Sequence, residues 1–465
     1  MLNGQCPHID FYSHVGFLTY LPTEIGLRIA GGTAWGLGYG QALVALLLGV
    51  WTFLITRKRL ADVPLTLMCI SVVLMAVGPF ALGFSPMKPT PAMLYNRQGY
   101  ALLALILAEA FQPATRSVER EDLWGGISTG AILPILFFLK ITYFVVALFL
   151  LVTLLPCRAQ SRPRLLGIAA GLIVVTATCC AYYSFHTGPL VRDLITVGGS
   201  KHIHFGWYLI DGLVEDAGIV AALAVSAALL LNVYRERNAA VAVALAGVAV
   251  AFAGSAIIFG NYEQRGFPMA GFLAIMVLNA VNLRIPVVRT APDYFHVSVL
   301  VLGSVLIAGS LFSGMLGMTF ALGQRMFLHR STAFNLPRLN GFTAGPDDAW
   351  YTEFVNDGVS LVERFKQPKD TIMSLDFTNP FSYGFSMRPA YGGTPVLQYG
   401  TTFNDRFKPS PEFLIGSADL VAVPKKASDP TLDDNVPRLY GSYMQNHFHL
   451  LGESRDWRLY RRNGP

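Results

Sequence analysis

A single carboxylate near the start of the chain is the best candidate for acid–base chemistry. Asp10 lies two residues after His8 and four before His14, in a stretch that precedes the first long apolar segment. Pro7 prevents a helix at the start of this stretch, and a carboxylate held there could accept a proton from a reacting hydroxyl group. His14 is the second candidate catalytic residue, because it would share a helical face with Asp10 if the stretch were helical. The alternative is an amphipathic leader over residues 1–31, with aromatic anchors and a solvated Asp10.

Basic side chains in the predicted outer loops are candidates for binding a phosphate. Arg97 precedes an apolar span, Lys140 interrupts a long apolar run, and Arg192 lies in a loop over residues 186–208. Arginine can bind two phosphate oxygens at once, and a lysine in an apolar run must reach the membrane surface or a wet cavity. The candidates for substrate binding are Arg97, Lys140, Arg192, Lys201, His202, Glu263 and Arg265. The alternatives are headgroup anchoring for Arg97, snorkelling for Lys140 and a flexible connector for residues 186–208.

The sequence GGSK at residues 198–201 is a candidate anion nest, because successive backbone N–H groups and an ammonium can surround a phosphate. It lacks the spacing and the flanking strand of a P-loop. His202 and His204 would suit a metal ion if the backbone were extended, but no third ligand follows at a defined spacing. The alternative for Glu263 and Arg265 is a surface salt bridge between them, which would contribute ~0–1 kcal/mol to stability. The sequence therefore predicts no cofactor, and a divalent metal is not indicated.

Two further polar sites have open interpretations. Glu109 lies in a predicted span and marks either an interior partner or the cytoplasmic end of the helix, and we expect the helix end because Pro113 follows closely. Asp376, Asn379 and Tyr383 follow a predicted strand, and they either contact an acceptor or form an ordinary turn at the strand end.

The composition is that of a polytopic membrane protein. Of 465 residues, 53% are hydrophobic and only 14% are charged. The net charge of +6 fits basic cytoplasmic loops, and we expect no binding to nucleic acid. The 5 cysteines include no CxxC pair, so no disulfide framework or zinc site follows.

Apolar runs predict about ten membrane-spanning helices, since ~20 residues are needed to cross the hydrocarbon core. The long run that Lys140 interrupts is interpreted as a hairpin of two short helices. The predicted spans are residues 32–55, 64–85, 98–113, 125–139, 141–156, 165–185, 209–233, 239–259, 267–283 and 295–321. Loops rich in arginine alternate along the chain with loops that hold fewer basic residues. Because arginine-rich loops stay on the cytoplasmic side of a membrane, this alternation places both termini on the extracytoplasmic side.

The C-terminal part, residues 323–465, has the only clear soluble pattern. Residues 346–365 are amphipathic and predict a helix, and a second helix is expected near 439–445. Strands are expected at residues 371–377, 394–398, 419–424, 447–451 and 457–461. The predicted fold is mainly α, a polytopic helix bundle over residues 1–322 with an outer first loop at 1–31, followed by a small extracytoplasmic α/β domain over 323–465.

The N-terminal stretch fits the pattern G-x-x-P-x-x-D-F-Y-x-x-x-G and is followed by many apolar spans. This combination resembles the bacterial GT-C-type integral membrane glycosyltransferases, the superfamily of protein O-mannosyltransferases and lipid A aminoarabinose transferases. The residues that fill the pattern are Gly4, Pro7, Asp10, Phe11, Tyr12 and Gly16. The tail over residues 448–462 resembles the periplasmic tail of these enzymes, and residues 140–143 fit the K-x-T/S-Y setting of a lysine in the family.

The resemblance implies an inverting enzyme of the bacterial inner membrane that acts on the extracytoplasmic side. It implies transfer of a sugar from a polyprenyl-phosphate donor to a lipid, glycan or protein acceptor, with Asp10 as base or acceptor-orienting carboxylate. Asp10 is then expected to point into a cavity shared with Lys140, Lys201 or Arg265. Members of the family usually begin with a transmembrane helix, whereas residues 1–31 lack the regions of a signal peptide, so either the chain starts late or that helix is dispensable.

Two other classes of protein compete with this interpretation. A transporter or flippase of lipid-linked sugars would need an internal repeat and ionisable residues at the middle of the membrane. Here the charges gather at the ends of spans and no repeat is visible. The other alternative is a non-catalytic relative of the glycosyltransferases.

Overall fold

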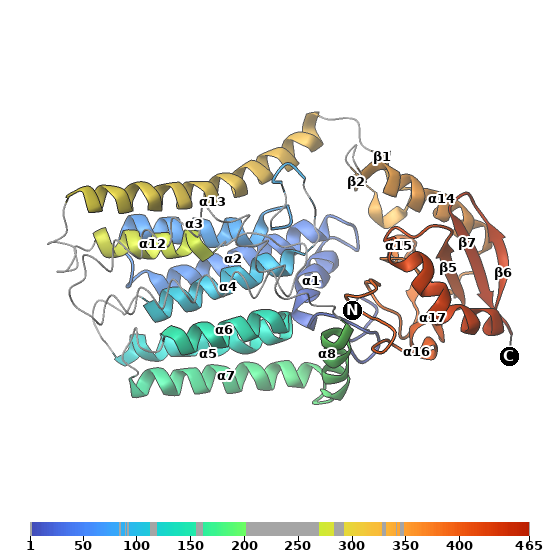
Figure 1. Cartoon of the computed structure of the whole chain (residues 1–465), viewed down its shortest axis with the longest axis horizontal. Coiled ribbons are helices and arrows are strands. Elements are labelled where there is room, and N and C mark those ends of the chain that lie inside the picture. The colour runs from blue at the N-terminus through green and yellow to red at the C-terminus, as the bar shows by residue number, and fades with distance from the viewer. Residues whose placement is uncertain are drawn as a thin grey trace. The chain divides into compact units, whose positions relative to one another are not determined.

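The computed structural model shows a mainly helical chain (Figure 1). It describes residues 2–82, 85–88, 90, 93–111, 119–154, 161–200, 269–282, 293–327, 332–340, 342–344 and 348–464. Contacts divide the chain into two compact units. The loop-and-sheet unit comprises Met1–Gly40, Tyr183–Ile203 and Gln324–Pro465, and the helical unit comprises Gln41–Tyr182 and His204–Gly323. The first loop is thus grouped by contacts with the C-terminal part, while the domain boundaries 1–322 and 323–465 stay a prediction.

Long apolar helices build the helical unit. They are α2 (Gly36–Thr56), α3 (Asp62–Val77), α4 (Leu94–Phe111), α5 (Glu119–Leu139), α6 (Ile141–Leu154), α7 (Arg162–Tyr182), α12 (Met269–Asn282) and α13 (Asp293–Phe327). Within the described residues, 3 helices, namely α2, α5 and α7, are long and apolar enough to cross a membrane. Together with the composition, these helices define an integral membrane protein.

Each predicted span within the described residues coincides with one of these helices. The spans predicted at 209–233 and 239–259 lie outside those residues, so the number of about ten stays a prediction. The span predicted at 64–85 is too long, because α3 ends at Val77 before Gly78 and Pro79. A proline disfavours helical geometry in the residue before it, so the chain leaves the helix there.

The predicted hairpin at Lys140 is confirmed, because α5 ends directly before this residue and α6 begins directly after it. Lys140 lies near Asn96 at the start of α4, with 3.4 Å between Nζ and Oδ1. Arg164 near the start of α7 contacts Glu109 near the end of α4, with 2.6 Å between Nη2 and Oε2. α6 packs against α4.

Helices α5 and α7 pack with their backbones in direct contact. Each helix carries two glycines four residues apart at this interface, Gly126 and Gly130 on α5 and Gly167 and Gly171 on α7. A Cβ atom on Gly130 would lie 2.1 Å from the Ile168 carbonyl oxygen, and one on Gly171 would lie 2.3 Å from that of Ile127. Small residues at this spacing are typical of membrane helices that pack closely, because lipid provides no hydrophobic drive between helices.

The loop-and-sheet unit begins with η1 (Phe17–Thr19) and α1 (Leu21–Ile29) and also includes α8 (Gly188–Ser200). Its C-terminal elements are β1 (Thr332–Ala333), η4 (Pro337–Leu339), β2 (Thr343–Ala344), α14 (Ala349–Phe365), β3 (Thr371–Ser374), α15 (Pro380–Gly384), β4 (Arg388–Pro389), α16 (Pro411–Ile415), β5 (Leu420–Pro424), α17 (Leu432–His447), β6 (Phe448–Glu453) and β7 (Trp457–Arg462). The helices predicted near 346–365 and 439–445 correspond to α14 and α17. No strand forms at residues 394–398, where Pro395 lacks the N–H that a ladder needs.

The C-terminal sheet is mixed, with the strand order β4-β3-β5-β7-β6. β3 pairs in parallel with both β4 and β5, whereas β7 pairs antiparallel with β5 and with β6. β6 and β7 correspond to the strands predicted at 447–451 and 457–461, and they form a hairpin that shifts register between Leu450 and Gly452. The prediction of a small α/β domain after the helices is therefore confirmed in its secondary structure.

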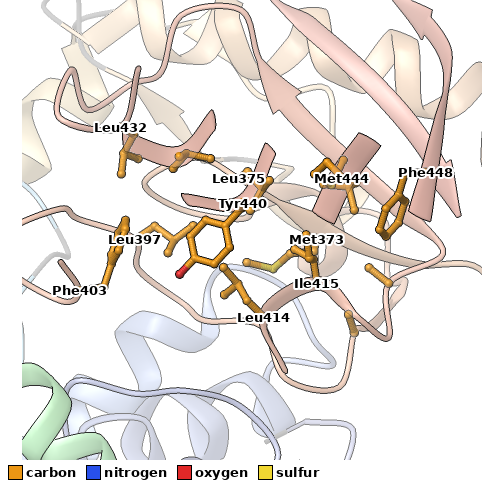
Figure 2. Close-up of a cluster of buried hydrophobic side chains, with 14 residues drawn as sticks. Met373, Leu375, Leu397, Phe403, Leu414, Ile415, Leu432, Tyr440, Met444 and Phe448 are labelled. Atoms are coloured by element: carbon orange, nitrogen blue, oxygen red, sulfur yellow. The ribbon is translucent and has the colours of Figure 1, made fainter. Parts of the chain in front are cut away.

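Two hydrophobic cores lie on opposite faces of this sheet, because neighbouring residues in a strand point to opposite sides. On β5, Val421 belongs to one core and Leu420 to the other. The first core surrounds Tyr440 of α17 (Figure 2). The second core gathers α14 side chains around Trp457, whose indole N–H donates to the Phe354 carbonyl at 2.8 Å. A helix thus covers each face of the sheet.

The first loop is joined to the C-terminal part of the same unit by backbone hydrogen bonds. The Gly392 N–H donates to the Asp10 carbonyl oxygen at 2.6 Å, and the Tyr12 N–H donates to the Gly393 carbonyl oxygen at 3.1 Å. Gly392 has a φ of +84°, and a Cβ atom there would lie 1.5 Å from the Phe413 carbonyl oxygen. Only glycine fits this position, so the junction depends on it.

Candidate active site

The Asp10 carboxylate closes a tight loop. Its Oδ2 atom accepts a hydrogen bond from the Cys6 N–H at 2.6 Å, and the Asp10 N–H donates to the Cys6 carbonyl oxygen at 2.9 Å. A further bond of 2.8 Å joins the His8 N–H to the Phe11 carbonyl oxygen. Asp10 is half-buried, and its Oδ1 atom has no hydrogen-bond partner among the described residues. One oxygen is therefore held in place while the other can accept a proton or orient a hydroxyl group.

His8 forms a buried pair with Asp193 that the sequence analysis did not predict. Nδ1 of His8 lies 3.0 Å from Oδ2 of Asp193, and the same oxygen accepts from the Ser13 N–H at 3.2 Å. His8 has a φ of +70°, an uncommon conformation for a residue with a side chain. The pair joins the first loop to α8. His8 stands in the motif, but its partner lies far along the chain, so sequence spacing carried no signal for the pair.

The expectation that His14 shares a helical face with Asp10 is wrong. Residues 10–14 are not helical, and the first helical turn starts at Phe17. His14 is half-buried in an irregular segment. The backbone bonds that close the loop at Asp10 replace the bonds that a helix would need.

The predicted connector at residues 186–208 is largely helical where it is described, and the expected anion nest does not form at 198–200. These residues are the last turn of α8, and the Asn404 side chain donates to the carbonyl oxygens of Gly199 and Ser200 at 3.1 and 3.2 Å. A helix C-terminus presents carbonyl oxygens and partial negative charge, which repel a phosphate.

Arg192 on α8 is exposed, and its Nε atom lies 3.7 Å from Oδ1 of the buried Asp193. Its guanidinium also lies 5.6 Å from the centre of the Phe413 ring. The charge of Arg192 therefore reaches solvent beside the pair formed by His8 and Asp193.

Arg97 and Lys140 are both buried in the helical unit. Arg97 donates from Nε to the Phe80 carbonyl oxygen at 2.6 Å and from Nη1 to that of Met75 at 3.2 Å. Its guanidinium stacks 4.0 Å from the centre of the Phe80 ring, so Arg97 holds the end of α3 against α4. Lys140 lies between the Asn96 side chain and the Tyr95 ring, 5.0 Å from the ring centre. Substrate binding by either residue stays a prediction.

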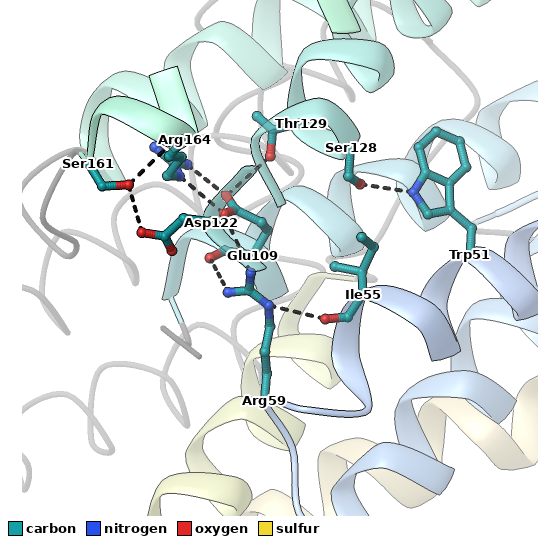
Figure 3. A network of polar contacts seen from close by, with 9 residues as sticks. All are labelled: Trp51, Ile55, Arg59, Glu109, Asp122, Ser128, Thr129, Ser161 and Arg164. Atoms are coloured by element: carbon teal, nitrogen blue, oxygen red, sulfur yellow. Dashed lines mark hydrogen bonds and ion pairs between the residues drawn. The ribbon is translucent and has the colours of Figure 1, made fainter. Parts of the chain in front are cut away.

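Glu109 is at the centre of a buried charge network (Figure 3). Arg164 binds both of its carboxylate oxygens, with Nε–Oε1 at 3.1 Å and Nη2–Oε2 at 2.6 Å. Arg59 Nη2 lies 3.9 Å from Oε1, and the Thr129 hydroxyl donates to Oε2 at 3.2 Å. Glu109 thus lies near the helix end, as expected, and also has interior partners. Arg59, which follows α2, and Arg164, near the start of α7, therefore meet at one end of the bundle.

Four predicted site residues lie outside the described residues. They are Lys201, His202, Glu263 and Arg265. The expectation that Asp10 points into a cavity shared with Lys140, Lys201 or Arg265 therefore stays a prediction.

The polar cluster after β3 divides into two structural residues and one that lines a cavity. Asp376 accepts from the N–H and the hydroxyl of Ser428 at 2.8 and 2.9 Å, and burial raises the pKa of its carboxyl group. Asn379 accepts from the Phe381 N–H and caps α15. Tyr383 borders a cavity of about 270 Å³ in the loop-and-sheet unit. The ordinary turn is thus the correct interpretation for Asp376 and Asn379.

The cavity is lined by the first loop, α1, Arg338 of η4 and residues between 382 and 395. Tyr383, a candidate acceptor contact from the sequence, lines it, and so does Phe11, the neighbour of Asp10. None of the predicted catalytic or substrate-binding residues that the structure describes does so. Beside it, burial raises the pKa of the Tyr383 hydroxyl above its ordinary value. No group of three or more His, Cys, Asp and Glu side chains gathers as a metal site in the described part of the chain.

The fold and composition define the class of this protein as an integral membrane protein with helical spans and a small α/β unit. No protein-family model and no curated protein matches the chain. Among solved structures, it is similar to the crystal structure of ArnT from Cupriavidus metallidurans in the apo state, with a TM-score of 0.43 and 13% identity over 98% of this chain and 89% of that chain. Similarity at this level assigns neither a family nor an activity.

Proposed function

We propose that this protein is a membrane glycosyltransferase that moves a sugar from a polyprenyl-phosphate donor to an extracytoplasmic acceptor. Asp10 acts as the base for the acceptor hydroxyl or orients it. The observation that supports this role is the closed loop at Asp10, in which the Cys6 N–H fixes Oδ2 at 2.6 Å. A carboxylate held by the backbone is oriented before the substrate arrives, which is what general-base catalysis requires.

The loop that contains Asp10 is also held by contacts with other parts of the same unit. The Asp10 carbonyl oxygen accepts from the Gly392 N–H, and the pair of His8 and Asp193 joins the loop to α8. In the proposed reaction, Asp10 takes the proton of the acceptor hydroxyl as that oxygen attacks the anomeric carbon. The polyprenyl phosphate leaves with the electron pair of the broken bond. Lys140, Arg192, Lys201 and Arg265 are proposed to neutralise its charge.

The test is turnover by the full chain reconstituted in liposomes with a panel of polyprenyl-phosphate sugars as donors and with lipid, glycan and protein acceptors. Asp10→Asn keeps an oxygen that can accept from the Cys6 N–H, so the loop is expected to stay closed. We expect this variant to lower the rate of polyprenyl-phosphate release by about 10²–10⁴-fold, the usual contribution of a general base.

Asp434→Asn is the matched control, because Asp434 is an exposed acid on α17 of the same unit. It is expected to turn over at the wild-type rate. Equal turnover by Asp10→Asn and the wild type would remove Asp10 from the mechanism. Absence of turnover by the wild type with every donor would count against the proposed donor class.

A further inference from the structure

The cavity of the loop-and-sheet unit combines one cation with aromatic walls. Arg338 contributes the guanidinium, and the rings come from Phe11, Tyr20 and Tyr383. At about 270 Å³, the cavity lies just below the ~300–1,000 Å³ that is typical of small-molecule sites. Its volume therefore suits a single ring with its substituents rather than a chain of several sugars.

Arg338 is held in position by its backbone and by the ring of Tyr383. Its backbone carbonyl oxygen accepts from the Ala34 N–H at 3.1 Å, and its guanidinium lies 5.6 Å from the centre of the Tyr383 ring. The Tyr383 hydroxyl in turn donates to the Gly32 carbonyl oxygen at 2.9 Å. No ion pair joins Arg338 to an acidic side chain in the described part of the chain. A half-buried guanidinium of this kind is suited to bind two oxygens of a carboxylate or phosphate.

The remaining walls suit a ring that carries hydroxyl groups. Phe11 and Tyr20 meet edge to face with their ring centres 6.1 Å apart, and the Tyr20 hydroxyl lies 2.8 Å from the Ser13 hydroxyl. Glu24 lines the cavity, and its Oε1 accepts a hydrogen bond from Arg28 at 2.7 Å, so the adjacent cation offsets part of its charge. Asn3 and Gln5 add amide groups. Apolar faces with a few polar groups between them are the usual setting for an amphipathic ligand.

We infer that this cavity binds an anionic monosaccharide, with Arg338 on its acidic group and the aromatic walls against the sugar ring. The acidic group is a carboxylate, as in a uronic acid, or a phosphate ester. Phe11 adjoins Asp10 in the first loop, so the bound sugar is assigned as part of the acceptor, and this assignment rests on the proposed function. The binding itself does not depend on turnover.

The experiment is isothermal titration of the full chain in nanodiscs of phosphatidylcholine, without any donor. The probes are glucuronate, glucose 6-phosphate, glucose and inorganic phosphate. We expect at least one anionic sugar to bind tenfold or more tightly than both glucose and inorganic phosphate, and the better of the two identifies the acidic group. Failure of both anionic sugars to bind tenfold more tightly than glucose and inorganic phosphate, or no binding of any probe, would overturn the inference.

Three variants give this titration its controls. Arg338→Gln is expected to remove the preference for the anionic sugar, whereas Arg338→Lys keeps the charge and is expected to retain part of it. Arg364→Gln changes an exposed arginine on α14 that does not line the cavity, and it is expected to bind as the wild type does. Retained preference in a folded Arg338→Gln protein, checked by its thermal unfolding, would contradict the inference.

Asp10→Asn separates this inference from the proposed function. The variant is expected to bind the anionic sugar with the wild-type affinity while its turnover falls. If binding fails in the wild type but turnover depends on Asp10, only the cavity assignment is wrong. If the anionic sugar binds but Asp10→Asn turns over normally, the catalytic role is wrong and the binding site stands.

Discussion

The two units differ in how they bury polar groups. In the helical unit, glycines bring α5 and α7 into backbone contact, and Glu109 is enclosed by two arginines. In the loop-and-sheet unit, two apolar cores stabilise the sheet, while Asp10 and Arg338 stay half-buried outside both cores. Charges that are paired inside a bundle serve its structure. Asp10 and Arg338 are oriented but only partly satisfied, so these two charges of the loop-and-sheet unit are available to a ligand.

The largest expected effect comes from the buried network of the helical unit. Glu109→Gln would leave Arg59 and Arg164 as buried charges without their carboxylate, which typically costs ~3–5 kcal/mol. The measurement is the free energy of unfolding of the full chain in mixed detergent micelles. Glu121→Gln is the matched control, because Glu121 pairs with the exposed ammonium of Lys58 at 2.6 Å and such surface pairs contribute ~0–1 kcal/mol. Equal losses in the two variants would refute the structural role of the network.

A smaller effect is expected at the interface between α5 and α7. Gly130→Ala would place a Cβ atom 2.1 Å from the Ile168 carbonyl oxygen, so the helices must separate, at a cost of ~1–3 kcal/mol. Gly38→Ala on α2 meets no atom within 4 Å and should stabilise its helix by up to ~1 kcal/mol. The free energy of unfolding should therefore fall in Gly130→Ala and rise in Gly38→Ala. Stabilisation by Gly130→Ala would show that the helices do not pack through this glycine.

The smallest effect concerns Asp376 in the loop-and-sheet unit and depends on pH. Burial raises the pKa of Asp376 above 3.8, so the folded protein holds this proton more tightly than the unfolded chain. Its contribution to stability is therefore present below pH 3.8 and is lost as the pH rises through the raised pKa. Asp376→Asn, whose amide oxygen can still accept from Ser428, should gain stability relative to the wild type as the pH rises through that window.

The contribution of Asp405 to stability depends on pH in the opposite direction. The hydrogen bond from Arg438 lowers the pKa of this exposed carboxyl group, so its contribution is present above 3.8 and is lost as the pH falls. Asp405→Asn should therefore lose stability relative to the wild type as the pH rises. The measurement for both variants is thermal unfolding of the full chain between pH 3 and pH 7. If the stability of the two variants relative to the wild type changed with pH in the same direction, the opposite pKa shifts assigned to Asp376 and Asp405 would be contradicted.

Local patterns were enough to predict most of the secondary structure. The apolar runs located the helices within the described residues, and the amphipathic helix and the last two strands of the C-terminal part formed as expected. The predictions failed where a helix-breaking residue was overlooked or where tertiary contacts outweighed the local pattern. Gly78 and Pro79 ended α3 early, and the backbone bonds around Asp10 excluded the helix that would have aligned His14.

Composition and periodicity by themselves determined that this is a helical membrane protein with a small α/β part, because apolar length and repeat are properties of contiguous residues. The tertiary structure alone decided that Asp193 pairs with His8, that Arg164 encloses Glu109, and that Arg338 faces a cavity beside the first loop. These partners lie tens to hundreds of residues apart in sequence. Their meeting depends on the packing of whole elements, and no spacing rule along the chain encodes it.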